Sequence, residues 1–268
     1  MNFKIKSLIN SAMDIWGGLT RFEFWMTFGM NDIKAKYRRS ALGQLWITLS
    51  VAVFIVVIGG LYKGIFSSHD GSYLTYLGVG YILWLFISDS LNTGCTALIK
   101  AKNFMLQREV PVSTFSFRLI YREFLTTLHH LILLPPIFIW ANQWPGFENI
   151  AISIIGFTIV IFTTFWAILF LSIVSLRYRD IQPVVTSLVR MAFFATPIIW
   201  IERDLGPFGN WVTLFNPFGY FLKVVRNPLL SESVLFLDWI VVLILAFATM
   251  FITLITLAIS KNKLVYWY

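Results

Sequence analysis

The chain has 268 residues, of which 58% are hydrophobic and 13% are charged, and its formal net charge is +8. Soluble domains carry roughly 25% charged residues, and a single core of this length cannot hide so much apolar surface. The composition therefore excludes an ordinary soluble domain and predicts an integral membrane protein. Anionic lipid headgroups attract Lys and Arg as well as nucleic acids do, so no nucleic-acid partner is expected.

Residues 1–42 precede the first long apolar run and are predicted to form amphipathic interface helices. In residues 5–16 the apolar side chains recur at helical spacing, with Lys6, Asn10 and Asp14 on the opposite face. Residues 19–30 continue in a similar, less regular manner. Two interpretations stay open, a membrane-surface anchor and a helix that contacts a partner protein.

Crossing a bilayer takes about 20 predominantly apolar residues in a helix. Five stretches meet this length, and a sixth is weaker because it carries Arg190 and two prolines. We expect Arg190 to lie near an end of its span or to face protein or water. The transmembrane domain is therefore predicted over 43–260, as an all-α fold whose six spans cover about 43–62, 73–97, 119–141, 150–176, 183–201 and 238–260.

Residues 205–230 are apolar but interrupted by Pro207, Pro217 and Pro228. The pieces of about ten residues are too short to cross, and re-entrant half-helices are the natural alternative. A structure that dips into the outer leaflet accounts for the many aromatic side chains. The residues predicted to form this external gate are Trp211, Phe215, Phe218, Tyr220 and Arg226.

The distribution of cations orients the predicted bundle. All Lys and Arg residues except Lys63, Arg203, Lys223 and Arg226 fall on one side of the six spans. By the positive-inside rule this side is cytoplasmic. Both termini are then cytoplasmic, and residues 261–268 form a cytoplasmic C-terminal tail.

Motifs for enzymatic chemistry are missing from the sequence. No glycine is followed by lysine, so the phosphate-binding G-x-x-x-x-G-K-[ST] loop is not present, and H-E-x-x-H and C-x-x-C are also missing. We therefore predict that the chain is not an enzyme and binds no cofactor itself. Any ATP and Mg²⁺ are bound and used by a partner subunit.

Asp89 is a carboxylate inside a predicted span, and such acids are candidates for function. A helix-packing hydrogen bond, the lining of a polar path and proton coupling all remain open for it. Tyr81, Trp84 and Phe86 precede it in an aromatic series. Aromatic rings suit the C–H face of a sugar, although lipid contact and helix packing explain them equally well.

Three stretches of the sequence resemble ABC-2-type export permeases, especially the polysaccharide and O-antigen branch. Residues 98–118 resemble the cytoplasmic coupling segment between spans two and three, and residues 216–230 resemble the N-P…R…L-L stretch before the last span. The most specific match is the pattern D-x-x-x-R/K-Y-x-x-S-x-L-G-x-x-W, at Asp32, Lys36, Tyr37, Ser40, Leu42, Gly43 and Trp46.

The resemblance implies a homodimer paired with two cytoplasmic ABC ATPase subunits in the bacterial inner membrane. The dimer would enclose a path for a polysaccharide linked to undecaprenyl diphosphate, with Tyr81, Trp84, Phe86 and Asp89 lining it. The cytoplasmic mouth would receive the diphosphate at Tyr37, Arg38, Arg39, Leu42 and Gly43, since guanidinium groups match phosphate oxygens. Anchoring to headgroups is the alternative for these cations.

The same resemblance implies contacts with the ATPase through three cytoplasmic segments. The residues predicted for this coupling are Arg21, Glu23, Lys100, Lys102, Arg108, Glu109, Arg177, Arg179 and Asp180. Two other functions stay open. One is an ABC-2 permease for teichoic acid or a small drug, and the other is a membrane-embedded transferase that uses Asp89, His129 or His130 as an acid or base.

Overall fold

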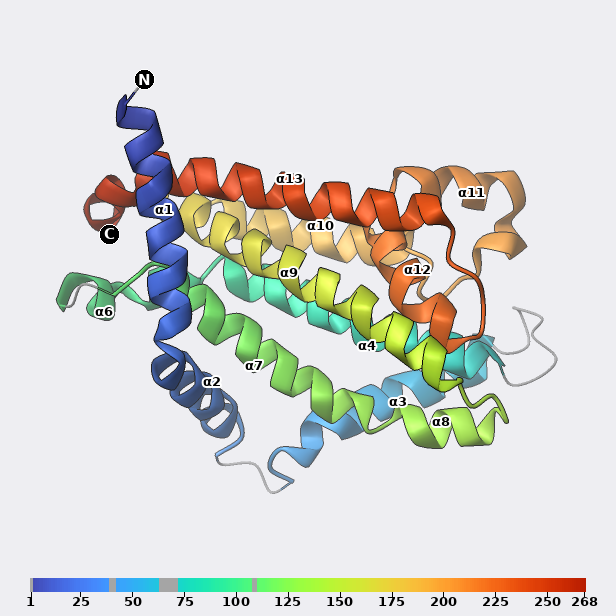
Figure 1. Ribbon diagram of the computed structural model, residues 1–268. Coiled ribbons are helices and arrows are strands. Elements are labelled where there is room, and N and C mark those ends of the chain that lie inside the picture. Colours follow the sequence, from blue (N-terminus) through green and yellow to red (C-terminus); the bar gives the residue numbers. More distant parts are fainter. Residues whose placement is uncertain (1, 39–41, 63–71, 108–109) are drawn as a thin grey trace.

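The computed structural model describes residues 2–38, 42–62, 72–107 and 110–268 (Figure 1). Within these ranges every regular element is a helix, which confirms the predicted all-α class. Five of the helical segments are long and apolar enough to cross a membrane. They are α3 (Leu45–Tyr62), α4 (Ser72–Gly94), α7 with α8 (Ser113–Leu131 and Leu134–Trp140), α9 (Phe147–Arg177) and α13 (Phe236–Ser260).

The sixth predicted span is a shorter helix, α10 (Ile181–Ala195). Its 15 residues rise about 22 Å, which is less than the roughly 30 Å hydrocarbon core of a bilayer. The helix stops because Thr196 precedes Pro197 and takes an extended conformation, with ψ of 138°. Helix α10 packs on α4 and α9 and runs along the bundle in Figure 1, so it has the direction of a span but is shorter than one.

Two helices lie across one end of the bundle, where both chain termini are also found (Figure 1). They are α1 (Asn2–Thr20) and α2 (Phe22–Tyr37). Two short helices at the same end, α5 (Ala97–Lys100) and α6 (Lys102–Gln107), connect α4 to α7. We refer to this end as the α1–α2 end.

The opposite end carries the proline-rich region as two helices, α11 (Gly206–Phe215) and α12 (Pro217–Leu229), after a short 3-10 helix, η1 (Glu202–Leu205). Pro207 and Pro217 stand in the first turns, where proline suits a helix. The Asn216 side chain accepts a hydrogen bond from the backbone N–H of Phe218 at 3.0 Å and caps α12. The region is therefore helical, in two pieces as predicted.

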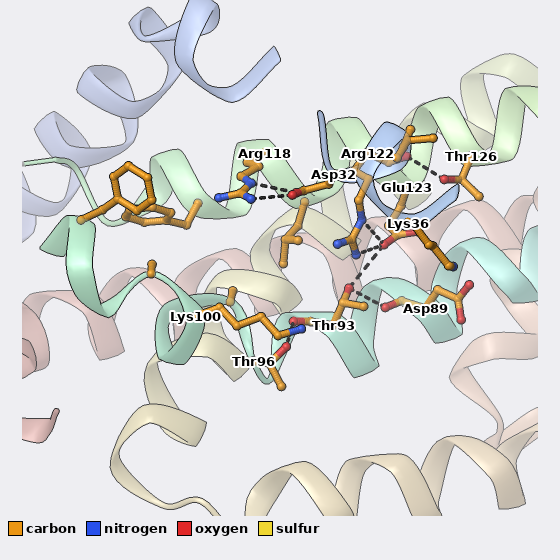
Figure 2. Close-up of a pocket in the computed structure, with 16 residues that line it drawn as sticks. Asp32, Lys36, Asp89, Thr93, Thr96, Lys100, Arg118, Arg122, Glu123 and Thr126 are labelled. Carbon is orange, nitrogen blue, oxygen red and sulfur yellow. Dashed lines mark hydrogen bonds and ion pairs between the residues drawn. The ribbon is translucent and has the colours of Figure 1, made fainter. Parts of the chain in front are cut away.

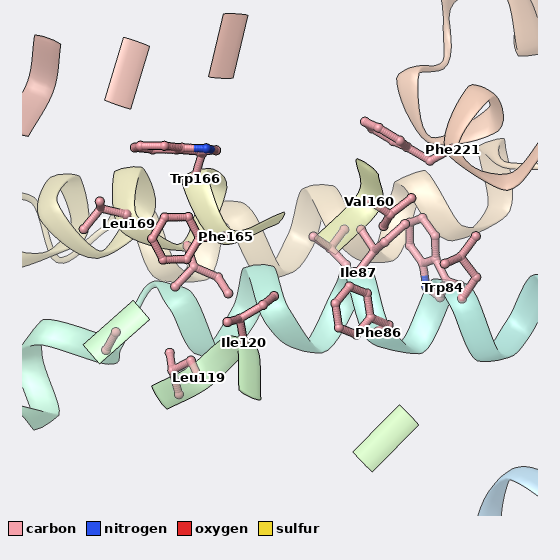
Figure 3. Close-up of a cluster of buried hydrophobic side chains, with 14 of the residues drawn as sticks. Trp84, Phe86, Ile87, Leu119, Ile120, Val160, Phe165, Trp166, Leu169 and Phe221 are labelled. Atoms are coloured by element: carbon pink, nitrogen blue, oxygen red, sulfur yellow. The ribbon is translucent and has the colours of Figure 1, made fainter. Parts of the chain in front are cut away.

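The core lies between α4, α7, α9 and α12, as Figure 3 shows. Trp84, Phe86 and Ile87 of α4 meet side chains of α7 and α9 there. Helices α9 and α12 approach closely because residue 156 is glycine: a Cβ at this position would lie 2.5 Å from the carbonyl oxygen of Val224. Of these core helices, α4 and α7 also line the cavity described next.

Candidate functional site

A cavity of about 540 Å³ lies between α2, α4 and α7 near the α1–α2 end (Figure 2). We call it the polar cavity, because charged groups from all three helices and from α5 line it. Four are cations and three are carboxylates, so the wall offers both donors and acceptors. The charged residues are Asp32, Lys36, Asp89, Lys100, Arg118, Arg122 and Glu123.

One wall of the polar cavity is formed by an ion pair between α2 and α7. Arg118 donates from Nε to Oδ2 of Asp32 at 2.8 Å and from Nη2 to Oδ1 at 2.6 Å. This bidentate geometry is the strong form of an arginine–carboxylate pair. The same guanidinium lies 5.3 Å from the ring centre of Phe28 on α2. The contacts position α2 against the side of α7.

Five residues after Arg118, α7 also brings a buried carboxylate to the cavity wall, which the sequence analysis did not single out. Glu123 is 5% exposed and pairs with the neighbouring Arg122. Thr93 of α4 donates to the Oε1 atom of Glu123 at 3.4 Å. A sequence signal was available, because Arg122 and Glu123 fall within the span predicted over 119–141, where charged groups are candidates for function.

The predicted cytoplasmic mouth adjoins the polar cavity. Lys36 lines the cavity one residue before the end of α2 at Tyr37, and Arg38 follows with an exposed side chain. Arg39 lies outside the described residues. Leu42 is exposed, and Gly43 has φ of +55°, a conformation open to glycine. This turn leads directly into α3.

The four predicted path-lining residues are not brought together. Only Asp89 reaches the polar cavity, with an exposed side chain. Trp84 and Phe86 are 4% and 2% exposed in the subunit core, and Tyr81 stacks on Phe54 of α3 at 3.8 Å. Their rings contact protein within this one subunit, so their predicted role along a path stays a prediction.

The three candidate acid–base residues of the transferase alternative do not share the polar cavity. His129 places Nδ1 2.8 Å from the carbonyl oxygen of Leu125 in its own helix. His130 is 5% exposed. Of the three predicted acid–base residues, the polar cavity has only Asp89 in its wall.

The predicted coupling residues that the structure describes are all exposed at the α1–α2 end or at helix junctions beside it. Arg21 and Glu23 lie at the junction of α1 and α2, and Lys100 and Lys102 lie on α5 and α6. The junction of α9 and α10 exposes Arg177, Arg179 and Asp180. Arg108 and Glu109 lie outside the described residues.

Asp14 is a further residue of this end that sequence reasoning missed. It is 4% exposed, and its Oδ1 accepts a hydrogen bond from the backbone N–H of Ser113 at 3.1 Å. Its Oδ2 accepts from the N–H of Val112 at 3.3 Å. A carboxylate of α1 therefore caps the N-terminus of α7, where negative charge is favourable.

The burial of Asp14 shows which face of α1 points inward. Ser11 and Asp14 are buried against the bundle, whereas Met13 and Trp16 are 64% and 68% exposed. Of the predicted polar face, Asp14 packs on the protein and Asn10 stays exposed. The apolar face is left pointing away from the subunit.

The predicted external gate divides into an exposed and a buried group. Trp211 and Phe215 of α11 are exposed and stack with ring centres 5.9 Å apart. Phe218 is half-buried and meets Trp84 edge to face. Tyr220 is buried and donates to the carbonyl oxygen of Leu214 at 3.0 Å.

Arg226 belongs to the buried group. It is 3% exposed, and its Nη1 donates to the carbonyl oxygen of Pro197 at 2.5 Å. Its guanidinium lies 3.7 Å from the ring centre of Tyr76 on α4. The residue thus joins α12 to α4 and to the extended segment after α10.

Apolar helices of membrane-spanning length, packed around a charged cavity, define a multi-pass membrane protein. The chain belongs to the family described as ABC-2 type transporter, whose family model matches residues 24–230. These residues run from the first turn of α2 to the end of α12, and they include the polar cavity.

Individual relatives cover almost the whole chain. Two O-antigen export system permease proteins RfbA of Klebsiella pneumoniae are 23% and 25% identical, each over 91% of this chain and 93% of the relative. An O-antigen export system permease protein RfbA of Myxococcus xanthus is 22% identical over 63% of this chain and 65% of the relative.

Proposed function

We propose that this chain is the transmembrane permease subunit of an ATP-driven transporter that exports a lipid-linked polysaccharide of the O-antigen type. The observation that carries the proposal is the likeness to O-antigen export permeases over 91% of the chain. The polar cavity at the basic end of the bundle supports it, because an amphiphilic substrate needs a polar site beside apolar helices. The names of these relatives favour O-antigen over teichoic acid or a small drug.

The proposed assembly contains two copies of this chain and two cytoplasmic ATPase subunits that bind ATP and Mg²⁺. It lies in the bacterial inner membrane with both termini in the cytoplasm, as the distribution of cations supports. We assign α10 as the sixth span. Its exposed surface includes Ser187 and Arg190, and polar groups at membrane depth face protein or water rather than lipid. The path of the polysaccharide would therefore run along α10, between the two copies of the chain.

The diphosphate of the substrate is proposed to bind at the mouth of the polar cavity. Lys36 and Arg38 lie at this mouth. Arginine and lysine suit phosphate oxygens as bidentate donors and as point charges respectively. Asp32 and Glu123 pair with Arg118 and Arg122, and the exposed cations at the mouth would meet the diphosphate first.

Two apolar surfaces complete the proposal. The exposed face of α1, with Ile9, Met13 and Trp16, would rest on the inner leaflet as a surface anchor. The exposed rings of Trp211 and Phe215 would enter the outer leaflet from the far end, as part of a re-entrant external gate.

Co-purification and substrate accumulation test the proposed function together. The tagged subunit is expected to bring down an ATP-binding protein in near-equal amount, and cells lacking the subunit are expected to accumulate lipid-linked glycan inside. Restoring the wild-type gene provides the control. Purification of an intact subunit that retains no ATPase, or export that continues without the subunit, would contradict the proposal.

A further inference from the structure

Residues 261–268 were expected to be a simple tail, yet they pack against the bundle. Lys261–Trp267 form a 3-10 helix, η2, directly after α13. Leu264 is 1% exposed, and Trp267 and Tyr268 are half-buried against the core. Runs of 3-10 helix longer than three or four residues are uncommon. Tertiary contacts must therefore hold this one in place.

The first contact joins the segment to α1. Lys261 places Nζ 3.1 Å from Oδ2 of Asp14, the carboxylate that caps α7. The same Nζ donates to the carbonyl oxygen of Asn10 at 3.1 Å. One side chain thus connects the end of α13 to α1 and, through Asp14, to the start of α7.

The second and third contacts reach the coupling elements. Tyr268 donates its hydroxyl to the carbonyl oxygen of Leu98 on α5 at 2.9 Å. Burial raises the pKa of Tyr268 to about 12, so the hydroxyl keeps its proton at neutral pH. The guanidinium of Arg177, at the end of α9, lies 5.2 Å from the ring centre of Trp267.

We infer that the 261–268 segment joins α1, α5 and the end of α9 to the last span, so that these elements move as one body during transport. Lys261, Trp267 and Tyr268 are its positioning residues. The inference rests on the proposed function, because α5 and the end of α9 carry Lys100 and Arg177, which the resemblance to ABC-2 permeases predicts to contact the ATPase of the proposed assembly. A displacement of α5 or of the end of α9 by the ATPase would then move α1 and α13 as well, without deforming the helices between them.

The test uses the complete transporter in proteoliposomes, with ATP hydrolysis and glycan translocation measured on the same sample. Tyr268→Leu removes the contact with Leu98, and Tyr266→Leu is the matched control, because Tyr266 is 85% exposed. We expect Tyr268→Leu to lower the glycan moved per ATP at least fivefold, with recovery of the complex and its hydrolysis changed less than twofold. The control should keep the wild-type ratio.

Two results of this assay would overturn the inference. One is an unchanged ratio in Tyr268→Leu, and the other is an equal loss of translocation, hydrolysis and recovery, which indicates misfolding alone. A wild-type subunit that neither retains an ATPase nor moves glycan would instead overturn the proposed function, and the inference with it.

A cross-link separates movement as one body from simple stability. Asn10→Cys and Lys261→Cys are combined in a Cys95→Ala background and joined by a short bismaleimide. Because Lys261→Cys removes the contact with Asp14, the variant without the reagent should move less glycan per ATP than wild type. If α1 and the segment move together, the cross-link that replaces this contact should restore at least half of the wild-type ratio. A loss of translocation caused by the reagent would show that the two must separate, and would overturn the inference.

Discussion

Asp14 shows how one carboxylate can hold several elements together. Its two oxygens accept hydrogen bonds from the backbone N–H groups of Val112 and Ser113, and Lys261 neutralises it. Asp14→Ala removes both acceptors while leaving α1 free to form. We expect the free energy of unfolding to fall by about 2 kcal/mol, as for a lost helix cap that is also charged. Thermal unfolding of the detergent-purified subunit measures it.

The control for Asp14→Ala is Glu23→Ala, since Glu23 is an exposed acid at the start of α2. It should change the unfolding midpoint little. Asp14→Asn keeps one acceptor oxygen, so its unfolding midpoint should lie between those of Asp14→Ala and Glu23→Ala. Equal midpoints for the alanine variant and wild type would show that the cap contributes nothing.

The pair between Asp32 and Arg118 is a second prediction at the residue scale. Both side chains are about a quarter exposed, at 25% and 23%, so water screens the pair and weakens it. We expect a coupling of about 1 kcal/mol from the double-mutant cycle of Asp32→Asn and Arg118→Gln. Unfolding of the two single variants and the double variant measures it. Strictly additive changes would mean that the pair does not hold α2 to α7.

At the scale of helices, the contact between α9 and α12 depends on the missing side chain at residue 156. Gly156→Ala would place its Cβ 2.5 Å from the carbonyl oxygen of Val224, so the two helices must separate. Overpacking of this kind costs about 1–3 kcal/mol. A lower unfolding midpoint is therefore expected, measured by the loss of folded protein on heating in detergent.

Gly60→Ala is the matched control for this prediction. Residue 60 is also a helical glycine, in α3, and a Cβ there meets nothing within 4 Å. Alanine favours a helix over glycine by about 0.5–1 kcal/mol, so this variant should be as stable as wild type or more so. Equal behaviour of the two variants would contradict the close packing of α9 on α12.

The helices themselves were predictable because their cause is local. Apolar length identified the five long helices, and the positions of Pro207 and Pro217 identified the starts of α11 and α12. The inward face of α1 was not predictable, because it depends on which partner meets the polar side. Glu123 and Asp14 were missed for the same reason: their contacts lie on helices distant in sequence.

The candidate site was predictable in part. The motif around Asp32 and Lys36 indicated the mouth of the polar cavity, and Asp89 was singled out as an unusual acid. Arg118 and Arg122 were not, since they stand just before and just inside the start of the span predicted over 119–141, where headgroup contact explains cations without a cavity. The packing of the 261–268 segment could not be predicted from its eight residues, because its contacts are with Asn10 and Leu98, which are distant in sequence.

At the scale of the whole molecule, the number of membrane crossings decides on which side each terminus lies. An even number places both termini on the same side of the membrane. The five long helices alone would put the termini on opposite sides if α10 did not cross, whereas Figure 1 shows both termini at the α1–α2 end. A helix of 15 residues can still cross when Thr196–Ile201 continues its path, with non-helical backbone buried in protein. Ile198 and Ile201 are indeed buried.

Cysteine labelling in intact cells tests this crossing directly. Single cysteines at Gln182, before the crossing, and Asn210, beyond it, are exposed positions, and Cys95→Ala removes the native thiol. A membrane-impermeant maleimide should label Asn210→Cys from outside and leave Gln182→Cys unlabelled until the cells are opened. Lys263→Cys, predicted on the inner side, should behave like Gln182→Cys. If Gln182→Cys and Asn210→Cys reacted from the same side, α10 would not cross the membrane. Only the five long helices would then be left to span the bilayer, and the six-span assignment would fail.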